Sequence, residues 1–142
     1  MRELNTKISS NTSDIDVFDI VTSPYMDING QRKIGLFLII YMEKQDPNDY
    51  NNRNVTGLKL TSRDLYANMY RTLVTREDVP ELLADSYIYA NKPSTLLSSH
   101  CRFVNRLPSN LCEEVRDKLN VYLSQVTDQT TNKLIKNLKG GE

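Results

Sequence analysis

The sequence has no tryptophan, one histidine, two cysteines and only five glycines, and its 18 basic residues balance its 18 acidic ones. None of the patterns G-x-x-x-x-G-K-[ST], G-x-G-x-x-G and G-x-S-x-G occurs, so the common phosphate-binding loops and the nucleophile elbow are excluded. A structural zinc site has four protein ligands, so His100, Cys101 and Cys112 would need a carboxylate as the fourth. We interpret these three as ordinary half-buried residues and predict no catalytic residue, cofactor or metal site.

The sequence also lacks a long hydrophobic run. Its longest, residues 34–42, falls well short of the roughly 20 apolar residues that span a bilayer. The N-terminus has no apolar signal-peptide core, and two cysteines without such a signal are more often reduced than bridged. We therefore expect no membrane insertion and a cytoplasmic or nuclear location. The abundance of Asn, Tyr, Ile and Lys hints at an AT-rich genome, viral or otherwise.

The size and composition favour one folded domain. The chain has 142 residues, of which 39% are hydrophobic and 25% charged, within the range of folded soluble proteins. Residues 1–13 are polar and are predicted to form a flexible N-terminal arm. Residues 14–142 are predicted to form a single α+β domain.

The N-terminal half carries strand signals. Residues 34–42 are apolar at both odd and even positions, so as a strand they need cover on both faces and should lie in the centre of a sheet. Asn29-Gly30 predicts a tight hairpin turn to an edge strand that begins at Ile15. Residues 55–60 suit a third strand. The polar stretch before it, residues 44–54, predicts an exposed loop, either functional or disordered.

The C-terminal half is predicted to be helical. Thr61 with Asp64, and Thr75 with Asp78, resemble helix caps, which suggests one helix over residues 61–74 and a second ending before Pro93. Residues 94–107 suit a helix, with a short strand at 101–104 as the alternative. A last helix starts at Asn110 and runs to Gly140, with a possible break at 128–131. The predicted fold is a small antiparallel sheet of about three strands, covered by three to four helices.

Three aspartates offer a candidate metal site. Asp14, Asp16 and Asp19 alternate with apolar residues near the first strand, and two of them could hold a divalent cation. The simpler interpretation is a solvated edge strand whose charges prevent aggregation. A small metal-dependent hydrolase or nuclease is accordingly only an alternative function.

A basic face is the second candidate. Lys133, Lys136 and Lys139 share one helical face and, together with Arg102 and Arg106, could bind phosphates. The neutral overall charge weakens that electrostatic attraction. A nucleic-acid-associated protein is the other alternative function.

Tyrosine supplies eight of the aromatic residues, against three phenylalanines. Tyr66, Tyr70, Tyr87 and Tyr89 cluster in the two predicted middle helices, and tyrosine is enriched at protein interfaces. We take these four as the candidate partner-binding surface. The favoured function is a non-enzymatic protein-protein interaction or assembly subunit of a larger complex, with a protein partner or a second copy of the chain; enzymatic activity is left open.

Overall fold

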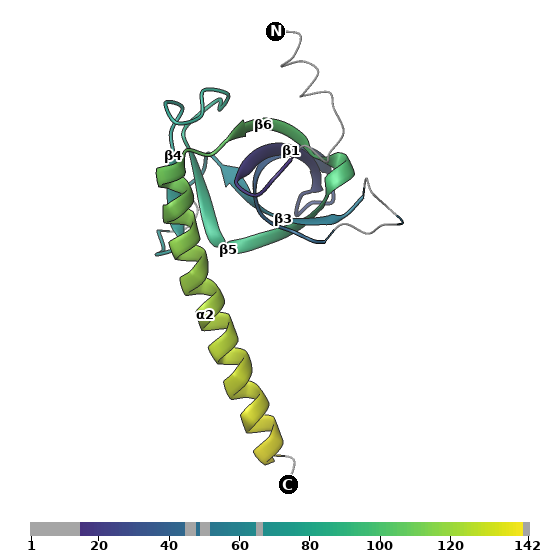
Figure 1. Ribbon diagram of the computed structural model, residues 1–142, viewed down its shortest axis with the longest axis vertical. Coiled ribbons are helices and arrows are strands. Elements are labelled where there is room, and N and C mark those ends of the chain that lie inside the picture. Colours follow the sequence, from purple (N-terminus) through teal and green to yellow (C-terminus); the bar gives the residue numbers. More distant parts are fainter. Residues whose placement is uncertain (1–14, 45–47, 49–51, 65–66, 141–142) are drawn as a thin grey trace.

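The chain folds into a curled antiparallel sheet with one long helix at its C-terminal end (Figure 1). This computed structural model describes residues 15–44, 48, 52–64 and 67–140, with side chains up to residue 127 of the last helix. The strands are β1 (Asp19–Met26), β2 (Arg32–Met42), β3 (Asn54–Thr61), β4 (Arg71–Val74), β5 (Ser86–Leu97) and β6 (Arg102–Arg106). A 3-10 turn, η2 (Ser98–His100), links β5 to β6, and the helix is α2 (Ser109–Gly140). The six strands are ordered β4-β5-β3-β2-β1-β6.

The predicted hairpin and central strand are confirmed, but the predicted edge position of the first strand is wrong, because β1 lies between β2 and β6. β1 and β2 pair antiparallel around a turn in which Gly30 has a φ of 80°, and Asp27 Oδ1 accepts hydrogen bonds from the Asn29 and Gln31 amides at 2.9 and 2.8 Å. β2 lies between β1 and β3. Only the middle of β2 is covered on both faces. At its start, Ile34 is 74% exposed.

The predicted helices over residues 61–107 are wrong, because this region forms β4, β5 and β6. The cap-like residues close turns instead. Asp78 Oδ2 accepts hydrogen bonds from the Thr75 amide and hydroxyl at 3.0 and 2.9 Å, without a helix following. Pro93 lies within β5 beside an irregularity in its pairing with β3. At such an irregularity a backbone hydrogen bond between the strands is missing, so a residue without an amide proton is tolerated. The fold is therefore a six-stranded half-barrel with one helix, not a three-stranded sheet under several helices.

One helix suffices because the sheet curls over its own second face. Successive residues of β1, Ile20 and Val21, belong to different clusters of buried side chains. The first cluster lies under the start of α2 and includes Leu111 and Val115. The second is built mainly from the sheet around Phe37. The alternation of side chains along a strand thus supplies both cores.

The N-terminal part of α2 packs against β4 and β5. Lys118 Nζ donates to Glu114 Oε2 at 2.7 Å, to Thr72 Oγ1 at 3.3 Å and to the Arg71 carbonyl. Further along, α2 leaves the sheet (Figure 1), and Leu123 is 51% exposed. Among the described residues, no helix combines the length and apolar character that a bilayer crossing requires. The predicted arm at residues 1–13 and most of the predicted loop at 44–54 lie outside the described residues.

Candidate nucleic-acid-binding groove

A groove lies across the ends of three inner strands, where β1 ends, β2 begins and β3 ends, beside residues 81–86. Its volume is about 680 Å³. Among the side chains that line it are three cations, Lys33, Lys59 and Arg63, and one carboxylate, Glu81. The hydroxyls of Thr61 and Ser62 and the side chains of Tyr25, Ile34 and Leu83 also line the groove. We call this site the basic groove.

Strand pairing brings the groove residues together. Lys33 pairs with Tyr25 across β1 and β2, and Lys59 pairs with Phe37 across β2 and β3. Lys59 Nζ lies 5.0 Å from the centroid of the Tyr25 ring, a cation–π distance. Gly35 leaves the space for this contact, because a Cβ there would lie 3.0 Å from Tyr25 Cε1 and 3.3 Å from Lys59 Cε.

The groove has an excess of positive charge. Lys33 Nζ pairs with Asp27 Oδ2 at 3.2 Å, but its side chain is 53% exposed. Amide donors, chiefly Gln31, together with Lys33 lower the pKa of Asp27, so this partner stays ionised at neutral pH. Lys59 and Arg63 take part in none of the ion pairs found among the described residues. Both cations can therefore bind an external anion.

Hydrogen bonds fix the two ends of the groove. Asn105 Nδ2 donates to Glu81 Oε1 at 2.8 Å, which leaves Oε2 for a ligand. Next to Arg63, Asp64 Oδ1 accepts from Arg71 Nη1 at 2.5 Å and from the Tyr89 hydroxyl at 3.2 Å. Glu81 and Asp64 are thus each held by strand residues, Glu81 by Asn105 of β6 and Asp64 by Arg71 of β4 and Tyr89 of β5.

These residue types match the chemistry of a phosphodiester ligand. Lysine and arginine bind phosphate oxygens through charge-assisted hydrogen bonds, and a carboxylate in reach of a hydroxyl can act as general base. Ile34 and Leu83 are 74% and 97% exposed at the rim, where they offer apolar contacts to bases. The described part of the chain contains no cluster of three His, Cys, Asp or Glu side chains that could hold a metal ion.

The four tyrosines proposed for partner binding do not lie on helices. Tyr87 and Tyr89 are on β5, Tyr70 precedes β4, and Tyr66 is outside the described residues. Tyr89 is only 4% exposed, the Tyr87 ring lies 5.3 Å from Arg71 Cζ, and the Tyr70 hydroxyl donates to Gln125. Their role in partner binding stays a prediction.

The predicted basic face is not brought to the groove. Arg102 Nη1 donates to the carbonyls of Ser99 and Cys101, and Arg106 Nη1 pairs with Asp19 Oδ1 at 3.2 Å. The side chains of Lys133, Lys136 and Lys139 lie outside the described residues, so nucleic-acid binding by this set stays a prediction. Sequence reasoning missed Lys33, Lys59, Arg63 and Glu81, because no local pattern marks them.

The aspartates considered for a metal hold a turn. Asp19 is 4% exposed, accepts a hydrogen bond from the Asp16 amide at 2.8 Å and pairs with Arg106. Burial raises the pKa of Asp19, although the Asp16 amide and Arg106 oppose that rise. Its carboxylate is thus committed to the fold, and Asp14 lies outside the described residues.

The two cysteines belong to different cores and do not meet. Cys101 Sγ donates to the Leu97 carbonyl and lies in the Phe37 cluster, whereas Cys112 Sγ donates to the Leu107 carbonyl under α2. Burial raises the pKa of Cys101 to about 11 and also raises the pKa of Cys112.

Both thiols should therefore resist labelling in the native protein. Because a thiolate is the reactive species, a disulfide reagent at pH 8 should label neither cysteine in buffer and both in guanidinium chloride. Absorbance at the reagent's product wavelength measures the result, and Cys101→Ala should remove one of the two equivalents in denaturant. Rapid labelling of either thiol in buffer would contradict the burial described above.

Similar solved structures share this fold. A MazE-MazF structure (Form-III) from Deinococcus radiodurans aligns with a TM-score of 0.56 and 17% identity, over 78% of this chain and 96% of that one. MazF (Form-I) from the same organism gives 0.54 and 18% over the same shares, and an endoribonuclease from a mycobacterial species gives 0.52 and 13%, over 77% and 91%. No family model and no curated protein sequence matches the chain.

This comparison overturns the favoured function from the sequence. A non-enzymatic assembly subunit with an α+β fold is wrong on two counts: the fold is mostly β, and the similar structures include an enzyme that cleaves RNA. The nuclease alternative fits better. At such low identity the likeness shows the fold, so the activity of this chain must be argued from its groove.

Proposed function

We propose that this protein is an endoribonuclease that cleaves single-stranded RNA in the basic groove. The observation that carries the proposal is the combination, in one groove, of two unpaired cations, Lys59 and Arg63, with the positioned carboxylate of Glu81. The likeness in fold to an endoribonuclease supports it. Unpaired bases suit the groove because they can stack on Tyr25 and contact the exposed side chains of Ile34 and Leu83.

The reaction uses the ribose 2′-hydroxyl as nucleophile. Glu81 takes the proton of this hydroxyl, the 2′-oxygen attacks phosphorus, and the bond between phosphorus and the 5′-oxygen breaks. The leaving 5′-oxygen takes a proton from water or from Lys33. Lys59 and Arg63 stabilise the negative charge that accumulates on the phosphoryl oxygens. The products are a 2′,3′-cyclic phosphate and a 5′-hydroxyl.

Purified protein should cleave a single-stranded RNA oligonucleotide at the same rate in 5 mM EDTA as in Mg²⁺. An otherwise identical oligonucleotide with 2′-deoxyribose throughout should bind but remain intact, because it has no nucleophile. Gel electrophoresis and mass spectrometry of the products measure both. Loss of cleavage in EDTA, or cleavage of the deoxy substrate, would contradict this chemistry.

We also propose that an acidic protein segment occupies the same groove and blocks RNA. The similar structures include MazE-MazF complexes, which supports a protein partner. Lys59 and Arg63 supply the complementary charge. The predicted cytoplasmic or nuclear location suits an RNA substrate.

A further inference from the structure

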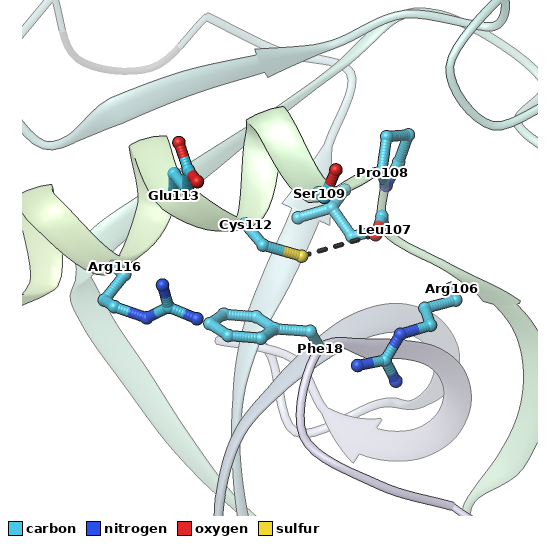
Figure 2. Close-up of a pocket in the computed structure, with 8 residues that line it drawn as sticks. All are labelled: Phe18, Arg106, Leu107, Pro108, Ser109, Cys112, Glu113 and Arg116. Atoms are coloured by element: carbon cyan, nitrogen blue, oxygen red, sulfur yellow. Dashed lines mark hydrogen bonds between the residues drawn. The ribbon is translucent and has the colours of Figure 1, made fainter.

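A second cavity lies where β6 passes into α2, and the proposed function does not use it. Its volume is about 530 Å³. Figure 2 shows Phe18 between the guanidinium groups of Arg106 and Arg116, with Ser109, Cys112 and Glu113 on the first turns of the helix above them. We call this site the arginine cavity.

Phe18 has a strained backbone. Its φ of 69° makes it the one residue other than glycine with a positive φ in the part of the chain that the structure describes. A bulky aromatic residue in this region is disfavoured because its Cβ approaches the backbone too closely. Three backbone hydrogen bonds keep the turn in place: Phe18 to the Ile39 carbonyl at 2.7 Å, Leu107 to the Phe18 carbonyl at 3.0 Å, and Asp19 to the Asp16 carbonyl at 3.1 Å. Such strain concentrates at functional sites, and here it aims an aromatic ring into a cavity.

The two arginines differ in how many partners their guanidinium groups already have. Arg106 Nη1 serves Asp19 Oδ1 at 3.2 Å and the Val17 carbonyl at 3.3 Å, so this guanidinium clamps the strained turn. The Arg116 guanidinium lies 5.2 Å from the Phe18 ring centroid, and no ion pair or hydrogen bond to it is found among the described residues. Arg116 is exposed and the Glu113 carboxylate points away from the ring in Figure 2. Arg116 is therefore free to bind an anion.

Arginine beside an aromatic ring suits a nucleotide. The planar guanidinium binds phosphate oxygens through two parallel hydrogen bonds, and a base can stack on the ring or on the guanidinium plane. A simple anion would use the charge but not the ring. The cavity thus matches a phosphate that carries a base.

The arginine cavity adjoins the basic groove through two neighbouring residues of β6. Asn105 donates to Glu81, which lines the groove, and the next residue, Arg106, lines the cavity. β6 therefore joins the two sites along the chain, and a strand of RNA must be long enough to extend from the groove past Glu81 to reach the cavity.

We propose that the arginine cavity is a second RNA subsite, which holds the phosphate and base of a nucleotide outside the groove on the same strand. This inference rests on the proposed function. Arg116 binds the phosphate, Phe18 supports the base, and Arg106 positions Phe18. Long oligonucleotides should reach this subsite, and short ones should not.

The test compares binding of a short and a long oligonucleotide that cannot be cleaved. Fluorescence anisotropy is measured with a trinucleotide and a dodecanucleotide of 2′-deoxyribose. Arg116→Gln should weaken binding of the dodecanucleotide about fivefold and reduce the salt dependence by about one phosphate contact, without affecting the trinucleotide. Phe18→Gly should weaken long-strand binding in the same way; glycine accepts the positive φ, but the ring also packs against the first core, so urea unfolding must show that the variant is folded under the assay conditions. Arg76→Gln, at an exposed arginine that lines neither site, is the matched control.

The possible outcomes separate the two proposals. If Arg116→Gln behaves like Arg76→Gln while the wild-type protein cleaves RNA, the subsite is wrong and the proposed function stands. If Arg116→Gln also weakens binding of the trinucleotide, the cavity is not a separate subsite. If the wild-type protein neither binds nor cleaves RNA, both proposals fail. A changed oligomeric state for Arg116→Gln, measured by light scattering, would identify the cavity as an interface between copies of the chain and overturn the subsite.

Discussion

Replacing Glu81 by glutamine should lower the rate of RNA cleavage by about 10²- to 10⁴-fold, the usual contribution of a general base. Glu81 is the only carboxylate among the described residues that line the basic groove. Glutamine keeps the shape and can still accept the Asn105 hydrogen bond through its carbonyl oxygen, but it cannot take the proton of the 2′-hydroxyl. The loss should appear in kcat, with KM little changed.

Two measurements make this prediction specific. Glu77→Gln, at an exposed glutamate outside the groove, should cleave at the wild-type rate. Binding of a 2′-deoxy oligonucleotide to Glu81→Gln should be equal or tighter, because a negative charge near the phosphate is removed. A Glu81→Gln protein that cleaves at the wild-type rate would assign the general base to another group.

The strands of the first half could be predicted because their signals are local. Asn29-Gly30 needs only its own backbone preference to make the hairpin, and Gly30 indeed has a positive φ. The apolar run around Phe37 needs cover on both faces wherever it lies, so its central position followed from composition alone. The start of α2 was also placed within one residue of its observed beginning at Ser109.

The prediction of helices in the second half was wrong because the same short sequence patterns occur at helix caps and in turns between strands. A threonine with an aspartate three residues later caps a helix, but in Thr75–Asp78 the same bonds close a turn between strands. Which use wins depends on tertiary partners: Arg71 and Tyr89 bind Asp64, and β5 offers Leu60 a pairing partner in Ile88. Tyr89 and Ile88 lie more than 20 residues from the groups they contact, outside the window in which a helix cap is recognised.

The site could not be predicted for the same reason. Lys33, Lys59 and Glu81 are ordinary charged residues in the sequence. The pairing of β1, β2 and β3 brings the two lysines to one groove, and Glu81 reaches it from the segment between β4 and β5, where Asn105 of β6 holds it. The residues chosen from the sequence were those in visible clusters, such as Lys133, Lys136 and Lys139. A cluster along the chain is a poor guide when the fold is a sheet, because neighbours in a sheet are distant in sequence.

Replacing Phe37 by alanine should destabilise the protein by about 3–5 kcal/mol. Phe37 is 1% exposed at the centre of the second core, and its ring meets the Tyr25 ring edge to face at 5.9 Å. The cavity left by the missing Phe37 ring should not close easily. Its neighbours Gly57 and Val55 belong to β3, and the pairing of β3 with β2 keeps their backbone from moving into the space. Since a domain of this kind is stable by about 5–15 kcal/mol, the variant should lose a large part of its stability. Urea unfolding followed by circular dichroism measures the shift in midpoint.

Tyr41→Ala is the matched control, because it removes an aromatic ring from the same strand at a position that is 59% exposed. Its cost should stay within about 1 kcal/mol, since little apolar surface returns to water. Because Tyr25 joins the Phe37 core to Lys59, loss of Phe37 should also loosen the groove. At temperatures where Phe37→Ala remains folded, its RNA binding should therefore weaken, whereas that of Tyr41→Ala should not. Equal stability of the two variants would show that the second core contributes little and that the sheet is held by the first core under α2.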